Sequence, residues 1–207
     1  VSISDHKIAI PSDTKIKQGN FLGLFAINND YPTNLSKAKA YLKRYESFEQ
    51  NLIYLDSAFI LLNKTDIDFP AFIQYYYLKN DNNGLINFVL NNTIDIQKYR
   101  NSDLALAFTR MAEFFAMNSL NDKAQKYYEN AVRLMPFVID YKLKHGAFLI
   151  KNKQLKVAKV IFESALFLNP TVKEIHLNLG YIFILQQNFL KADLYLKQAI
   201  SLDPDYV

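Results

Sequence analysis

Apolar positions in the second half of the chain recur with helical spacing and, over a longer range, with a period of 34 residues. Pro136, Pro170 and Pro204 are each 34 residues apart, and each follows a segment with helical spacing. A proline ends a helix because it has no backbone N–H to donate and restricts the residue before it. The prolines therefore divide this half of the chain into three repeated units. These units are 105–138, 139–172 and 173–206.

Each unit carries small residues and one large apolar residue at the same positions. The offsets of three and four residues among positions twenty, twenty-four and twenty-seven keep one face of the second helix apolar and compact. A small residue at position eight lets the first helix approach its partner closely. In chain order the residues are Ala112, Gly146 and Gly180 at position eight, Ala124, Ala158 and Ala192 at twenty, Tyr128, Phe162 and Leu196 at twenty-four, and Ala131, Ala165 and Ala199 at twenty-seven. The predicted antiparallel helix pairs are 105–118 with 122–134, 139–152 with 156–168, and 173–186 with 190–202.

This pattern resembles the tetratricopeptide repeat (TPR) family, in which a small eighth residue, alanines at twenty and twenty-seven and a closing proline define a helix–turn–helix unit. The resemblance implies an all-α fold: a right-handed superhelical array of antiparallel helix hairpins, a TPR solenoid. The chain departs from the family at position four, where Phe108, Lys142 and His176 replace the usual Trp.

The first half of the chain also favours helices, although the family pattern does not extend into it. Helical spacing over 35–63 fits one long helix or two shorter ones. Pro70 is suited to open the next helix, and the turn predicted at 81–84 separates that helix from a shorter apolar segment. We therefore expect an N-terminal helical region over 1–104, with an irregular lead-in at 1–34 and degenerate repeats as one interpretation, followed by the repeats over 105–207.

The composition argues against most kinds of catalytic or cofactor site. The absence of cysteine excludes disulfides, cysteine nucleophiles and thiolate metal sites. No glycine-rich phosphate loop occurs, and the acidic side chains are scattered along the predicted helices. Metal ligation by His145 and His176 would need further donors with matched geometry, so a packing role is favoured for both. We therefore expect no catalytic residue, no cofactor and no metal, and a chain that is not itself an enzyme but could be part of a larger one.

Six lysines lie between Asp140 and Glu163 with no acidic residue among them. A nucleic-acid surface would add stacking aromatics or arginines beside such charge, so we expect no nucleic-acid partner. The favoured interpretation is a solvated outer surface of the second repeat, and the alternative is attraction of an anionic partner or glycan. The lysines are Lys142, Lys144, Lys151, Lys153, Lys156 and Lys159.

The resemblance to the TPR family implies a concave groove lined by the first helix of each repeat. Its expected function is therefore that of a protein–protein interaction scaffold, an adaptor that binds a peptide or protein partner. The residue set with which some members grip a terminal carboxylate is missing, so a chaperone-tail clamp is disfavoured. The predicted groove residues are Thr109, Glu113, Leu143, Ala147, Ile150, Leu177, Tyr181 and Ile184.

An alternative function remains open at this point. A chain that begins at Val and lacks cysteine is compatible with the soluble periplasmic C-terminal domain of a bacterial membrane protein of glycan assembly, such as an O-antigen ligase or a protein oligosaccharyltransferase. We accordingly favour an extracytoplasmic location over a cytoplasmic one. No apolar stretch reaches the roughly 20 residues of a membrane helix. The many apolar residues of the last predicted helix, including Leu194 and Ile200, also predict self-association through the C-terminal repeat.

Overall fold

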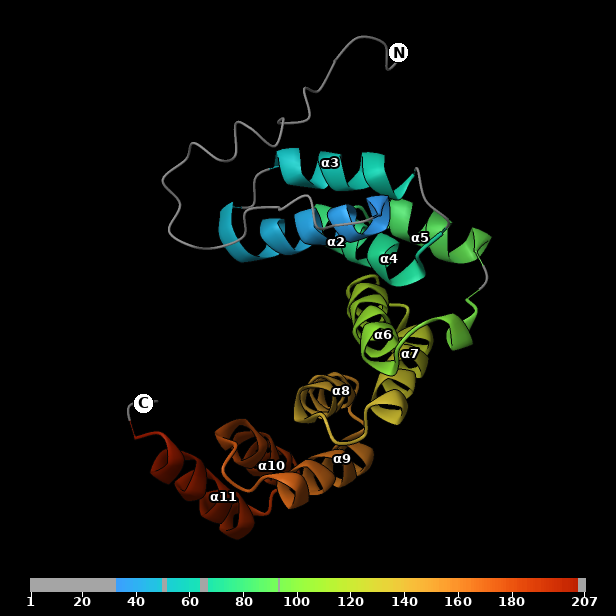
Figure 1. The fold of residues 1–207 in the computed structure, drawn as a ribbon. Coiled ribbons are helices and arrows are strands. Elements are labelled where there is room, and N and C mark those ends of the chain that lie inside the picture. The colour runs from blue at the N-terminus through green and yellow to red at the C-terminus, as the bar shows by residue number, and fades with distance from the viewer. Residues whose placement is uncertain (1–32, 50–51, 64–66, 93, 205–207) are drawn as a thin grey trace. The chain divides into compact units, whose positions relative to one another are not determined.

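The computed structural model describes residues 33–49, 52–63, 67–92 and 94–204. The chain forms two compact units, Val1–Thr93 and Ile94–Val207. Helices make up nearly all of the described residues, and no strand occurs among them, which confirms the predicted all-α fold with a helical N-terminal region (Figure 1). Most of the predicted lead-in at 1–34 lies outside the described residues.

The first unit contains two helices, not one, in the segment predicted as helical at 35–63. A π-helical stretch continues the first of them before the second begins. Asp68 caps the third helix, since its carboxylate accepts the Ala71 N–H at 3.0 Å, and Pro70 occupies the first turn as predicted. The elements are α2 (Asn34–Arg44), the π-helix (Tyr45–Glu49), α3 (Leu52–Leu62), α4 (Phe69–Lys79) and α5 (Asn82–Asn91).

The turn predicted at 81–84 is shorter in the structure. Helix α4 ends at Lys79, its C-cap Asn80 adopts a left-handed conformation, and α5 already begins at Asn82. Asp81 forms the N-cap of α5, because its carboxylate accepts the Gly84 N–H at 2.8 Å. The polar residues of this segment therefore start a helix, a role that the turn prediction missed.

A shared hydrophobic core holds the first unit together. Leu42 of α2, Leu55 of α3 and Tyr75 of α4 are all buried in one cluster. The rings of Phe59 and Tyr75 stack with 4.8 Å between their centroids. The helices of this unit thus bury their apolar faces against one another.

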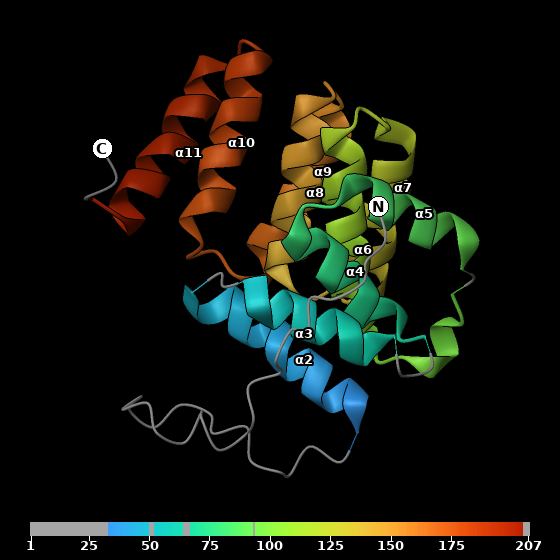
Figure 2. The same cartoon turned by 90° about the horizontal axis from the view of Figure 1, so that it is seen from above.

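The second unit consists of three antiparallel helix pairs, as the 34-residue period predicts (Figures 1 and 2). The predicted boundaries hold to within a residue, except that the first helix begins at Asn101 instead of 105. Asp103 lies in the first turn and pairs with Arg100 at 3.2 Å. Its negative charge near the N-terminus of the helix favours this earlier start. The helices are α6 (Asn101–Met117), α7 (Asn121–Leu134), α8 (Ile139–Lys151), α9 (Leu155–Leu168), α10 (Lys173–Leu185) and α11 (Phe189–Leu202), preceded by a short 3-10 helix (Ile96–Lys98).

The repeated spacing of small residues produces close helix contacts within the pairs. Ala158 and Ala165 of α9 are fully buried. A Cβ added to Gly146 would lie 2.4 Å from the Phe162 ring, so a side chain at this position would collide with α9. The predicted close approach at position eight is therefore confirmed in the second repeat.

The turn between the two helices of each repeat has the same unusual backbone. Ser119, Lys153 and Gln187 have φ values of 60°, 60° and 59°, although none of them is glycine. In the middle repeat the Lys153 N–H donates to the Ile150 carbonyl, and the next N–H donates to the Leu149 carbonyl. This is the hydrogen-bond pattern of a Schellman motif, which ends the first helix and reverses the chain.

Candidate functional site

The first helices of the three repeats lie side by side along one side of the second unit. Helix α8 packs against both α6 and α10, while each of α7, α9 and α11 pairs with the preceding helix of its own repeat. Figure 1 shows α6, α8 and α10 along the inner side of the curved array, with α7, α9 and α11 along its outer side. This arrangement makes the inner side the candidate binding surface.

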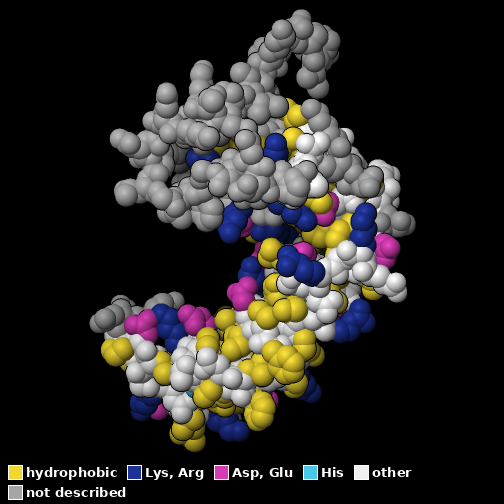
Figure 3. All heavy atoms as spheres, viewed as in Figure 1, with side chains coloured by type: hydrophobic (Ala, Val, Ile, Leu, Met, Phe, Trp, Pro, Cys, Tyr) yellow, Lys and Arg dark blue, Asp and Glu magenta, His cyan; other side chains and the backbone are white. Residues whose placement is uncertain are grey.

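The third repeat gives this surface its most exposed apolar side chains. Tyr181 is 49% exposed and Ile184 is 40% exposed, one turn apart on α10. Leu185 is also exposed, and Leu177 is half-buried one turn before Tyr181. A side chain of this kind stabilises a complex mainly when a partner removes it from water. Figure 3 shows apolar side chains gathered over α8 to α11 on the face in view.

The second repeat continues the row with smaller or more buried groups. Ala147 is exposed, whereas Leu143 and Ile150 are half-buried. All three lie on α8, which packs directly against α10. We name the six residues of α8 and α10 the apolar row. The apolar row consists of Leu143, Ala147, Ile150, Leu177, Tyr181 and Ile184.

The first repeat contributes polar groups that already have partners within the chain. Thr109 is buried, and its hydroxyl donates to the Ala105 carbonyl at 2.8 Å, so this side chain presents nothing to a ligand. The Glu113 carboxylate accepts a hydrogen bond from the Lys144 ammonium at 2.8 Å, and Asp140 lies 4.0 Å from the same ammonium. The two predicted groove residues on α6 are therefore buried or charge-paired, and they provide no apolar surface beside the apolar row.

The lysine cluster is only partly the solvated surface that the sequence favours. Lys142 is 8% exposed, and its ammonium donates to the Ser164 hydroxyl at 3.0 Å. Burial lowers the pKa of the Lys142 ammonium, because the charged form loses hydration. Lys159 pairs with Glu163 at 3.5 Å, while Lys151 and other lysines of the cluster are exposed. The expectation of a uniformly solvated cluster is thus corrected for Lys142.

The two histidines of the repeats are both buried. His145 stacks on the Tyr128 ring with 5.8 Å between centroids, and neither ring nitrogen has a hydrogen-bond partner. Burial lowers the pKa of His145. The Glu129 charge opposes this effect in part, and the Lys142 charge adds a smaller effect in the same direction as burial. The sequence showed where His145 and His176 lie in the repeat but not that both are buried.

The described residues provide neither a cluster of metal ligands nor a membrane-spanning helix. They contain no group of three or more His, Cys, Asp or Glu arranged to hold a metal ion. Their helices are all too short or too polar to cross a membrane.

Comparison with known proteins identifies the repeat. A family model for the tetratricopeptide repeat matches residues 173–206. YrrB, a TPR protein with an unusual peptide-binding site, superposes with a TM-score of 0.64 at 18% identity, covering 94% of this chain and 94% of YrrB. MamA superposes with a TM-score of 0.63 at 14% identity, covering 84% of this chain and 93% of MamA.

A double mutant of MamA gives a similar result, with a TM-score of 0.63 at 16% identity over 83% of this chain and 98% of that one. No curated protein sequence matches the chain at a significant level. At these identities the solved structures show a common fold, and the family model adds a sequence match in the third repeat. Residues 173–206 therefore match the tetratricopeptide repeat in sequence, and the helix pairs of the chain have the fold of a tetratricopeptide solenoid.

Proposed function

We propose that the chain is a non-catalytic scaffold that binds an apolar segment of a peptide or protein partner along the apolar row. The observation that carries this proposal is the exposure of Tyr181 and Ile184 on α10, next to the smaller apolar groups of α8. Exposed apolar side chains that adjoin one another are typical of interaction surfaces. Tyrosine is also enriched among residues that dominate binding energies.

The charge distribution supports an apolar partner segment over an acidic or basic one. The Glu113 carboxylate and the Lys144 ammonium neutralise each other at one end of the surface. Tyr181 and Ile184, at the other end, form no ion pair that would compete with a ligand. YrrB, which shares the fold, has a peptide-binding site, and this likeness favours a peptide as the ligand. The partner segment is expected to place its own apolar side chains against α10.

The test begins with peptides selected from a random display library on the immobilised chain. Selected peptides are then titrated by calorimetry against the wild type and against the double variant Tyr181→Ala, Ile184→Ala. We expect the double variant to bind at least about tenfold more weakly, since loss of interface anchors typically costs 1 kcal/mol or more. The substitutions lie on exposed positions, so the circular dichroism spectrum should not change.

Val160→Ala is the matched control, because Val160 is an exposed apolar residue of α9 outside the apolar row. This variant should bind the selected peptides as the wild type does. Unchanged affinity in a folded double variant, or an equal loss in Val160→Ala, would contradict the proposed site.

A further inference from the structure

Phe167 is the most exposed large apolar side chain among the described residues, with 90% of its surface accessible to solvent. It lies one residue before the C-terminal end of α9, at a position where the first and third repeats have Arg133 and Ser201. Single exposed apolar residues are common on protein surfaces, so the surroundings of the ring decide whether it has a role.

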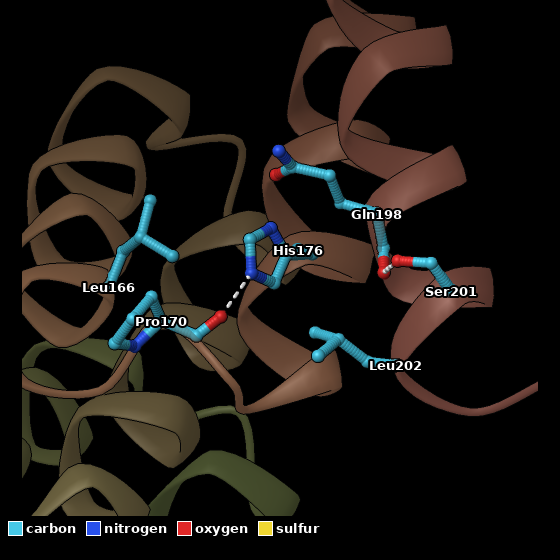
Figure 4. A pocket seen from close by; sticks show the side chains of 6 residues that line it. All are labelled: Leu166, Pro170, His176, Gln198, Ser201 and Leu202. Carbon is cyan, nitrogen blue, oxygen red and sulfur yellow. Dashed lines mark hydrogen bonds between the residues drawn. The ribbon is translucent and has the colours of Figure 1, made fainter.

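A pocket of about 410 Å³ lies beside this ring, where the C-terminal ends of α9 and α11 flank the start of α10 (Figure 4). Leu166, immediately before Phe167, and Pro170, three residues after it, both line the pocket. Figure 4 shows these two residues on one side, the residues of α11 on the other, and His176 between them. None of the lining residues belongs to the apolar row. They are Leu166, Pro170, His176, Gln198, Ser201 and Leu202.

The chemistry of the pocket suits an uncharged ring. No Lys, Arg, Asp or Glu lines it, and Leu166, Pro170 and Leu202 offer apolar contact surface. The Ser201 hydroxyl donates to the Gln198 carbonyl at 2.8 Å, and His176 Nε2 lies 2.7 Å from the Pro170 carbonyl oxygen. These polar atoms thus have partners within the chain, and an apolar ring would enter without burying an unpaired charge. The volume is also within the range of pockets that hold small ligands.

The position of the ring next to the pocket makes this surface complementary to a second copy of itself. In a two-fold arrangement each copy offers a projecting ring and receives one, so a single contact type is used twice. One occupant then covers both features. A partner of another kind would have to provide a ring for the pocket and a separate cavity for Phe167.

We propose that Phe167 of one copy of the chain inserts into this pocket of a second copy, which returns the same contact. The pocket of each copy is then completed by a residue of its partner, and the exposed ring is removed from water. Because both rings and both pockets are used, the contact closes as a dimer and does not extend into a fibre. This interface is separate from the apolar row and does not depend on peptide binding there.

The absence of tryptophan from the chain allows a direct test. Phe167→Trp places a single indole at the projecting position, and its fluorescence reports only on the surroundings of that side chain. We expect its emission maximum to move to shorter wavelength as the protein concentration rises, because insertion takes the indole out of water. The position is exposed, so the circular dichroism spectrum should not change.

A second substitution blocks the pocket. Ser201→Arg places a long charged side chain at the pocket wall, and Arg133 occupies the equivalent exposed position in the first repeat, so the variant is expected to fold. Added to Phe167→Trp, it should move the midpoint of the emission shift at least about tenfold to higher concentration, as expected for loss of an aromatic anchor.

Mixing two variants then tests the pairing of ring and pocket. Phe167→Ser has an open pocket but no ring, and serine is the residue of the third repeat at this position. Added to the double variant Phe167→Trp, Ser201→Arg, it should restore the emission shift, because the indole of one copy can enter the open pocket of the other. This readout follows the ring itself and is insensitive to association through other surfaces.

Phe137→Trp is the matched control, because Phe137 is 80% exposed and does not line the pocket. Its emission should stay that of an indole in water at every concentration. The proposal is overturned if Phe167→Trp shows no shift up to the limit of solubility or if Ser201→Arg leaves the shift unchanged. It is also overturned if mixing restores nothing or if Phe137→Trp shifts equally.

Discussion

At the scale of single residues, position eight of the repeat shows how a missing side chain sets the distance between two helices. A Cβ at Gly146 would lie 2.4 Å from the fully buried Phe162 ring, which has no space to move. A Cβ at Gly180 would lie 2.8 Å from Leu196, which is only half-buried on the last described helix. The same glycine is therefore more constrained in the second repeat than in the third.

This difference predicts opposite effects of one substitution. Alanine in place of a helical glycine gains about 1 kcal/mol in helix propensity at either position. At Gly146 the collision with Phe162 should outweigh that gain, and Gly146→Ala should lower the free energy of unfolding by roughly 1 kcal/mol. Gly180→Ala should be neutral or stabilising, because Leu196 can rotate away. Thermal denaturation followed by circular dichroism compares the two, and a more stable Gly146→Ala than Gly180→Ala would contradict the packing described.

His145 predicts a dependence of stability on pH. Its folded pKa is lowered by burial, whereas in the unfolded chain it has its ordinary value. As the pH falls through the ordinary range of histidine, the unfolded chain takes up a proton that the folded chain does not, so stability is lost toward acid. The melting temperature of the wild type should therefore fall more steeply between about pH 7.5 and about pH 5.5 than that of His145→Phe. Parallel curves for the two proteins would show that His145 does not titrate in this way.

At the scale of the helix pair, the left-handed turn between the two helices predicts a stabilising substitution. Lys153 is exposed with a φ of 60°, a conformation that a non-glycine residue adopts only at a cost of about 1 kcal/mol. Lys153→Gly should therefore raise the free energy of unfolding by roughly 0.5 kcal/mol, after the greater freedom of glycine in the unfolded chain is subtracted. Lys151→Gly, two residues earlier in α8, removes the same charge from a helical position and should destabilise by about 1 kcal/mol. If both variants are destabilised equally, the turn is not strained in solution.

Helix pairs are also the scale at which the sequence was most informative. The period of the prolines and alanines fixed the ends of α8 to α11 to within a residue, because those residues meet a partner helix once in every repeat. The start of α6 and the cap at Asp81 depend on single polar contacts that have no period, so the spacing of the apolar residues predicts neither.

The candidate site was less predictable than the fold for a related reason. Whether a side chain such as Thr109 or Lys142 faces solvent depends on what neighbouring helices leave uncovered. The third repeat has a pocket beside His176, at the position where the second repeat has Lys142, whose ammonium donates to Ser164. A family pattern describes what repeats share, and these features arise where the repeats differ.

At the scale of the whole molecule, stacking leaves one surface of the last described helix uncovered. Leu155 and Leu166 of α9 are half-buried, and α9 packs against α10. The residues 34 positions later, Phe189 and Ile200 of α11, are 67% and 52% exposed. Within the described residues, the surface that joins one repeat to the next therefore ends as an apolar face on α11.

This apolar face predicts that the chain associates with itself as its concentration rises. Exposure of an apolar stacking surface to water is unfavourable. Contact with the same surface of a second copy removes it from water and is therefore favourable. The double variant Phe189→Lys, Ile200→Lys introduces two charges on this face at exposed positions, so it should fold normally and associate less. Sedimentation velocity at several concentrations measures the difference directly.

Val160→Lys adds a charge on an exposed apolar site of α9 and should leave association unchanged, because that site is not part of the stacking surface. A wild type that sediments as a monomer at every concentration, with no gain in solubility for the α11 variant, would show that the face is stable in water and needs no partner copy.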